Sequence, residues 1–145
     1  MSANPDKAYL AAVREGRAAP GPISSCPAAE SLGARLVALD PVAGAIRIDF
    51  VAGSDAVNGA GVVLGGVLAA MLDLLAAFAV LAFTRAEVPG SIDLQVHFLR
   101  PARPGTLRGE ARLVQAGRRI AYTEAALYDA QDRAIVRGRS ALALR

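Results

Sequence analysis

The sequence of 145 residues is poor in the side chains that form cross-links, metal clusters and aromatic contacts. It contains one cysteine, one histidine and no tryptophan, and aromatic residues make up 5% of the chain. The single cysteine, Cys26, excludes an internal disulfide and any cysteine-based metal cluster. The hydrophobic fraction is nevertheless 54%, so the apolar residues are mostly alanine, valine and leucine. Such a composition indicates a large subunit interface or one unusually apolar segment.

Charge of neither sign dominates, since Lys and Arg number 16 and Asp and Glu number 13. The basic excess lies late in the chain, where the segment from Arg100 to Arg145 has ten arginines and four acidic residues. Such a segment can attract phosphates, although solvated strand faces explain it equally well. The chain has no basic run beyond Arg118-Arg119 and no aromatic stacking pattern. We therefore expect no nucleic-acid partner.

The first residues lack the continuous apolar core of a signal peptide, because Asp6, Lys7 and Arg14 interrupt them. This pattern predicts a cytoplasmic protein. The length predicts a single domain overall. Within it we expect an N-terminal helix and a Pro-rich loop over residues 1–27, and the main domain over residues 28–145.

Hydrophobic periodicity predicts one helix, two strands, a long helix and four further strands. In the second strand Ile46, Ile48 and Phe50 alternate with charged residues, and a period of two indicates one buried face. Runs of adjacent strands favour antiparallel pairing, with the long helix packed on one sheet face, so the fold class is α+β. The expected ranges are helix 6–15, strands 34–39 and 45–51, helix 62–83, and strands 92–99, 106–114, 120–128 and 134–144.

The long helix carries a single charge, Asp73, within residues 62–83. Its length would suffice to cross a bilayer. A charge at its centre would cost about 2.5–3.5 kcal/mol there, alanine drives insertion poorly, and the buried faces of the strands need a packing partner. We therefore expect a core helix that is wrapped by the sheet and touches a second subunit, and no membrane span.

A glycine-rich segment leads into this helix and places Gly65 and Gly66 at its start. The first amides of a helix have no partner inside it, and the helix dipole adds partial positive charge. Such amides can stabilise a developing oxyanion. Asp73 follows Gly65 by about 12 Å of helical rise, so it lines the same cleft or meets a neighbouring subunit. A lone carboxylate here is a candidate general base or nucleophile, or else a buried residue satisfied by hydrogen bonds.

Several motifs together resemble one family, the PaaI-like hotdog thioesterases, over about residues 34–144. The resemblance implies a hotdog fold, in which an antiparallel sheet wraps around one long helix. The residues that carry it are Asn58, Gly61, Gly65-Gly66, Asp73, Ser91-Ile92-Asp93-Leu94 and Phe98-Leu99-Arg100-Pro101-Ala102.

The resemblance implies hydrolysis of acyl-CoA thioesters by a homodimer or homotetramer whose site forms between subunits. Asp73 would activate water or attack the thioester carbonyl, and the Gly65 amide would polarise that carbonyl. Asn58 would orient the carbonyl or the water, and Ser91 would position the water. No metal and no redox cofactor are implied, and CoA is part of the substrate. The expected substrate-binding residues are Leu64, Gly66, Val67, Ala70, Arg100, Arg103 and Arg118, with the acyl group left open.

Leu64 departs from the family pattern, which usually has His-Gly-Gly at this place. Leucine cannot donate a hydrogen bond, and the loss of one oxyanion donor lowers the rate by roughly 10²–10³. A non-catalytic acyl-CoA-binding protein is therefore the alternative. A dehydratase or hydratase needs a histidine paired with a carboxylate. Because Leu64 stands where that histidine would be expected, this function is disfavoured.

The only histidine, His97, is expected to be structural. Strand alternation places it with Ser91 and Asp93 on the face opposite Ile92 and Leu94.

Overall fold

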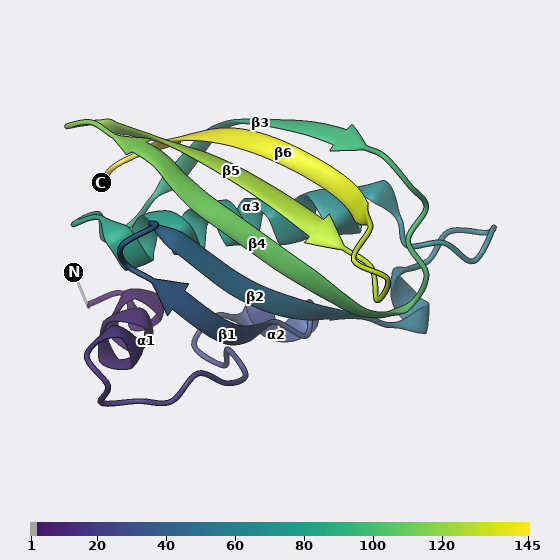
Figure 1. The fold of residues 1–145 in the computed structure, drawn as a ribbon, viewed down its shortest axis with the longest axis horizontal. Helices are drawn as coiled ribbons and strands as arrows, with labels where there is room; N and C mark the ends of the chain where they lie inside the picture. The colour runs from purple at the N-terminus through teal and green to yellow at the C-terminus, as the bar shows by residue number, and fades with distance from the viewer. Residues whose placement is uncertain (1–2) are drawn as a thin grey trace.

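The computed structural model describes residues 3–145 and contains one sheet of six antiparallel strands around one long helix. The spatial order of the strands is β1-β2-β4-β5-β6-β3, so β1 and β3 form the two edges. The sheet curls around helix α3, and helices α1 and α2 lie at the open side (Figure 1). The element bounds are α1 Pro5–Arg14, α2 Pro27–Ser31, β1 Arg35–Asp40, β2 Ala45–Ala52, α3 Gly65–Phe83, β3 Gly90–Phe98, β4 Gly105–Ala116, β5 Ile120–Tyr128 and β6 Ala134–Ala143.

This arrangement confirms the expected hotdog fold and the order of its main elements. Two short elements were not predicted from the sequence, α2 and the 3-10 turn Ser54–Ala56. Helix α3 begins at Gly65 rather than near residue 62, because Val63 donates its amide to the carbonyl of Ala102 and pairs with Val57 in an isolated bridge. The residues before Gly65 therefore belong to a loop.

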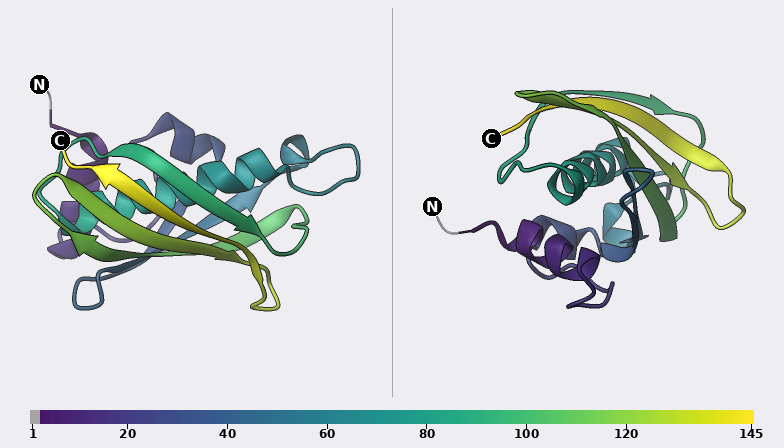
Figure 2. Two further views of the ribbon diagram at one scale, coloured as in Figure 1. Left: turned by 90° about the horizontal axis from the view of Figure 1, so that it is seen from above. Right: turned by 60° about the vertical axis from the view of Figure 1, so that its left-hand side comes forward.

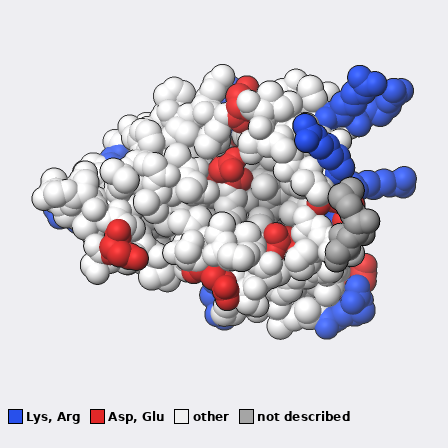
Figure 3. Space-filling view, turned by 180° about the vertical axis from the view of Figure 1, so that it is seen from behind, with Lys and Arg blue, Asp and Glu red and all other residues white. Residues whose placement is uncertain are grey.

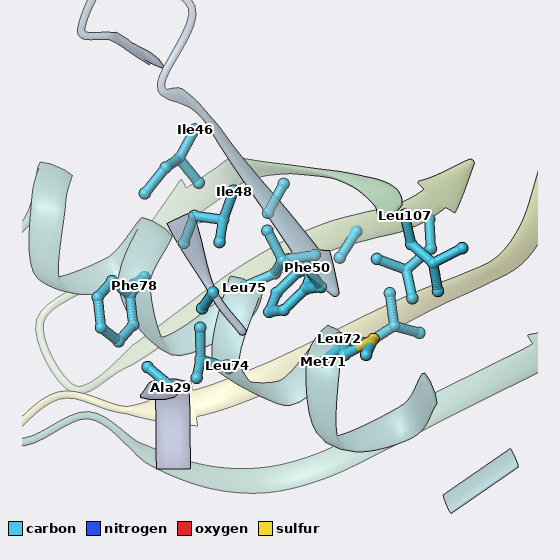
Figure 4. Close-up of a cluster of buried hydrophobic side chains, with 14 of the residues drawn as sticks. Ala29, Ile46, Ile48, Phe50, Met71, Leu72, Leu74, Leu75, Phe78 and Leu107 are labelled. Carbon is cyan, nitrogen blue, oxygen red and sulfur yellow. The ribbon is translucent and has the colours of Figure 1, made fainter. Parts of the chain in front are cut away.

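The core lies between the concave face of the sheet and α3. Buried side chains from β2, such as Ile48 and Phe50, meet Met71, Leu72 and Leu75 of the helix (Figure 4). By length and composition alone, helix α3 could cross a membrane, because an 18-residue window within it has a mean hydropathy of 2.3. However, 61% of that window is buried inside this single chain. Its apolar side chains thus form the core of the domain.

Helix α1 packs against the C-terminal half of α3 (Figure 2). Lys7 donates from Nζ to the carbonyls of Thr84 and Ala86, and Arg14 donates to the carbonyl of Ala82 at 2.9 Å. The last carbonyls of a helix lack partners within it and favour cations. The N-terminal segment therefore caps the end of the core helix and leaves its beginning free.

Candidate active site

Asp73 and Ser91 meet on the helix-facing side of the sheet edge formed by β3. The Ser91 Oγ atom donates a hydrogen bond of 2.6 Å to Oδ1 of Asp73. The Asp73 side chain is partly exposed and Ser91 is exposed. A carboxylate fixed in this way, whose second oxygen accepts no hydrogen bond from the described residues, can accept a proton from a water or attack a carbonyl carbon.

A β-bulge explains why Ser91 reaches the helix. Ser91 pairs with Leu142 and Asp93 pairs with Ala141, so the register of β3 shifts between them. Leu94 and Val96 pack against the core, whereas His97 lines the outer face with Arg137. The prediction that Ser91 shares a face with His97 is therefore wrong.

The same shift turns Ile92 to the exterior. Its side chain is 56% exposed, whereas alternation had placed it on the buried face with Leu94. The cause is again the extra residue in the strand, which reverses the alternation on one side of the bulge.

The start of α3 presents two glycine amides. Within residues 3–145 the amides of Gly65 and Gly66 donate to no other group, and the N-cap residue, Leu64, makes no side-chain cap hydrogen bond. The Leu64 side chain is 52% exposed. Unpaired first-turn amides at the positive end of the helix dipole suit a developing oxyanion.

The aromatic ring of Phe98, which was not among the expected site residues, stands beside Gly65. A Cβ atom on Gly65 would lie 3.3 Å from two carbons of the Phe98 ring, and the ring is 55% exposed. A hollow of about 340 Å³ adjoins Gly65 and Phe98, and its other lining residues are Val63, Leu68, Leu99, Arg100, Pro101 and Ala102. The only signal for Phe98 was its place in the Phe98–Ala102 motif.

Asn58 holds its own loop. Its Oδ1 atom accepts hydrogen bonds from the amides of Ala60 at 2.9 Å and Val62 at 3.4 Å, and Gly61 adopts a φ of 72° to close the turn. The Nδ2 group donates to no residue among those the structure describes. This group therefore stays available for a ligand, and no hydrogen bond joins Asn58 to Asp73 among the described residues.

The remaining expected binding residues fall into separate places. On the helix, Val67 is partly buried against the core, and Ala70 is exposed one turn before Asp73. Arg100 lines the hollow beside Gly65 and donates to the carbonyl of Ala134 at 2.8 Å. Arg103 lies in the same loop between β3 and β4.

Arg118 lies at the opposite end of the molecule. It belongs to the β4–β5 turn, where the carbonyl of Arg119 accepts from the amide of Leu144. The carbonyl of Arg145 in turn accepts from the amides of Glu87 and Val88, just after α3. In Figure 3 the most prominent group of Lys and Arg side chains lies at one end, whereas Asp and Glu side chains are scattered over the rest of the face. The expected arginines thus divide between the two ends of α3.

A larger hollow of about 650 Å³ lies on the outer face of the sheet, away from Asp73 and Gly65. Some of its charged lining residues pair with one another, since Glu124 contacts Arg112 at 3.3 Å and Arg139 at 3.4 Å. Nothing in it resembles the carboxylate and amide arrangement described above.

Comparison with known proteins decides the family. The model of the thioesterase superfamily matches residues 60–136, which include Gly65, Asp73 and Ser91. The chain belongs to the thioesterase superfamily. Among solved structures, a phenylacetic acid degradation-related protein from Ralstonia eutropha JMP134 is 31% identical, with 94% of this chain and 99% of that chain covered and a TM-score of 0.81.

Two more distant structures share the hotdog fold. PaaI from the Escherichia coli phenylacetic acid degradation operon is 18% identical over 99% of this thioesterase and 96% of its own chain, with a TM-score of 0.76. The protein smu.793 from Streptococcus mutans UA159, solved with acetyl-CoA, is 14% identical, with 76% of this chain and 86% of that chain covered and a TM-score of 0.70. No curated protein matches the chain. The thioesterase is thus of the PaaI-like type that its motifs indicated.

Proposed function

We propose that this thioesterase hydrolyses acyl-CoA thioesters to a carboxylic acid and CoA. The observation that carries the proposal is the Ser91–Asp73 hydrogen bond of 2.6 Å, which fixes a carboxylate in an otherwise apolar helix. The binding of acetyl-CoA by the distant structural neighbour supports CoA as the carrier. The reaction requires no metal and no redox cofactor, and we place it in the cytoplasm.

The proposed site combines two copies of the chain. Gly65 and Asp73 of one copy are about 12 Å apart along the helix, and no single thioester carbonyl touches both ends of that distance. The edge strand β3 carries the exposed apolar side chains of Ile92 and Phe98. Pairing of this edge with a second copy would cover them and bring the Gly65 amide of one copy toward Asp73 of the other. A homodimer is the smallest assembly that provides this, and a homotetramer of two dimers would provide it as well.

Each group then has a defined step. Asp73 takes the proton of a water whose oxygen attacks the thioester carbon, or its carboxylate oxygen attacks that carbon directly. The carbonyl oxygen gains negative charge, which the Gly65 amide stabilises. When the tetrahedral intermediate collapses, the carbon–sulfur bond breaks and the CoA thiolate leaves; on the water route the protonated Asp73 returns its proton to the thiolate. On the direct route the acyl group stays on Asp73 as a mixed anhydride, which a water then hydrolyses to the free acid and the restored carboxylate. Ser91 holds the carboxylate, and the Asn58 Nδ2 group orients the carbonyl or the water.

The rest of the substrate would extend from this carbonyl over neighbouring residues. Leu64, Gly66, Val67 and Ala70 would line the acyl end, where the groups facing the ligand are apolar. The phosphates of CoA would meet guanidinium groups. The two candidate places are Arg100 with Arg103 near the start of α3, and Arg118 at the other end.

Thiol release from a panel of thioesters tests the proposal. The panel contains phenylacetyl-, benzoyl-, short-, medium- and long-chain acyl-CoAs, each beside the matching pantetheine thioester that lacks the nucleotide. We expect turnover of at least one acyl-CoA and a higher KM for its pantetheine counterpart. If every CoA ester binds but none is hydrolysed, the protein is an acyl-CoA binder. The apolar Leu64 is then the candidate cause of the missing hydrolysis.

Subunit complementation tests the shared site. Asp73→Asn and Gly65→Ala chains are each purified and then mixed under conditions that exchange subunits. A mixed dimer has one site with both changes and one site with neither, so activity should reappear on mixing. Continued inactivity of a demonstrably mixed dimer would contradict a site built from two copies.

A further inference from the structure

At the bulge in β3, one backbone group of each strand bonds to a side chain of the other strand in place of a backbone partner. In an antiparallel ladder every second pair of opposed residues exchanges both backbone hydrogen bonds, and a bulge interrupts that exchange. Here the amide of Ala141 donates to Oδ1 of Asp93 at 3.0 Å. The Oγ atom of Ser140 donates to the carbonyl of Asp93 at 2.7 Å.

Both hydrogen bonds converge on one residue, Asp93, two positions after Ser91. Ser140 is 4% exposed, and it is one of two buried polar residues of the chain region described. A buried hydroxyl is costly to leave unpaired, so the contact between Ser140 and Asp93 fixes the position of the strand at the bulge. The register of β3 against β6 at this point therefore depends on side chains rather than on the backbone ladder alone.

That register determines which side chain faces Asp73. Because strand side chains alternate with a period of two, loss of the extra residue would reverse every side chain beyond it. Ile92 would then replace Ser91 opposite the carboxylate, and the hydrogen bond of 2.6 Å would disappear. The bulge is thus the local feature on which the Ser91–Asp73 pair depends.

We propose that Asp93 and Ser140 are positioning residues, which hold the β3 bulge and so keep the Ser91 hydroxyl against Asp73. Neither residue touches the substrate; each acts through Ser91. The catalytic consequence rests on the proposed function, whereas the structural consequence does not.

Steady-state kinetics of the wild type, Asp93→Ala, Asp93→Asn and Ser91→Ala test the catalytic side. Loss of one hydrogen bond to a charged group corresponds to a fall in kcat of roughly 10- to 100-fold for Ser91→Ala. We expect Asp93→Ala to lower kcat by about tenfold or more with little change in KM. Asp93→Asn keeps an oxygen that accepts from Ala141, so it should retain most of the rate.

The double variant Asp93→Ala/Ser91→Ala separates positioning from general damage. If Asp93 acts through Ser91, the double variant should be no slower than Ser91→Ala alone, because residues that act as a unit are not additive. A multiplied loss in the double variant would overturn the proposal. The matched control is Asp40→Ala, since the Asp40 side chain likewise accepts hydrogen bonds from backbone amides, those of Val42 and Ala43, at a distant turn.

Crystal structures of the wild type and Asp93→Ala give a readout that needs no activity. We expect the Ser91 Oγ–Asp73 Oδ1 contact to be lost or lengthened in the variant, with faster hydrogen exchange at the Ala141 amide. An unchanged contact would overturn the proposal even if the enzyme is active, whereas a wild type that hydrolyses no thioester refutes the function alone. If Asp93→Ala does not fold, Ser140→Ala, which removes one hydrogen bond to the bulge, is measured in the same ways.

Discussion

Replacement of Gly65 by alanine tests the role of the first helix amide. The new Cβ would lie 3.3 Å from two ring carbons of Phe98. Because that ring is 55% exposed, it can move by a few tenths of an ångström at little cost. Alanine is also the better helix former by about 1 kcal/mol. The free energy of unfolding should therefore stay within about 1 kcal/mol of the wild type.

Activity should respond far more than stability. A methyl group at position 65 and a displaced Phe98 both stand where the thioester oxygen would approach the amide. Loss of one oxyanion donor costs roughly 10²–10³ in kcat, and we expect Gly65→Ala to fall in this range. The assay is thiol release with the best acyl-CoA, alongside urea unfolding of the same preparation.

Two comparisons make the result specific. Gly21→Ala is the matched control, because a Cβ on Gly21 meets nothing within 4 Å and the residue lies outside α3. Gly65→Ala/Phe98→Ala removes the contact with the ring and is compared with Phe98→Ala alone, because Phe98 also lies on the proposed dimer edge. A lower rate in the double variant than in Phe98→Ala assigns that loss to the methyl group itself. Wild-type kcat in a folded Gly65→Ala protein would refute the oxyanion role.

Three further predictions concern other parts of the chain. Leu64→His should raise kcat, by up to roughly 10²–10³ if the added donor reaches the carbonyl oxygen. A lower rate in the acyl-CoA assay would instead show that the apolar side chain binds the acyl group. Gly109→Ala should destabilise the fold by about 1–3 kcal/mol in urea, since its Cβ would lie 2.5 Å from the carbonyl oxygen of Ile48; an unchanged midpoint would contradict this packing. The backbone amide of Arg133 chiefly lowers the pKa of Asp129, so this carboxylate adds stability at neutral pH that is lost as the pH falls through its lowered pKa. The advantage of the wild type over Asp129→Asn in urea should accordingly shrink below about pH 4, and a constant difference would contradict it.

The sequence predicted the fold well because its signals are local. Alternating residues such as Ile46, Ile48 and Phe50 mark strands, and the long apolar segment around Asp73 marks the core helix. The spatial strand order, with β3 beside β6, depends on pairing between distant segments, and periodicity alone does not specify it.

The sequence predicted which residues form the candidate site but not how they are arranged in space. The motifs named Asp73, Ser91 and Gly65, yet alternation placed Ser91 on the outer face. The bulge that turns Ser91 inward depends on Ser140 and Ala141 of another strand, so the sequence of β3 alone does not predict it. The split of Arg100 and Arg118 between opposite ends likewise follows from the tertiary fold.

The central claim is that the Asp73 carboxylate drives the chemical step, and single-turnover hydrolysis with Asp73→Asn tests it most directly. Enzyme is mixed with a smaller amount of the best acyl-CoA, and the reaction is quenched at set times to follow hydrolysis. The Kd of a non-hydrolysable analogue is measured for both proteins. We predict a fall of about 10³ or more in the single-turnover rate, with the Kd and the melting temperature nearly unchanged. A wild-type rate in the folded Asp73→Asn protein would contradict the account.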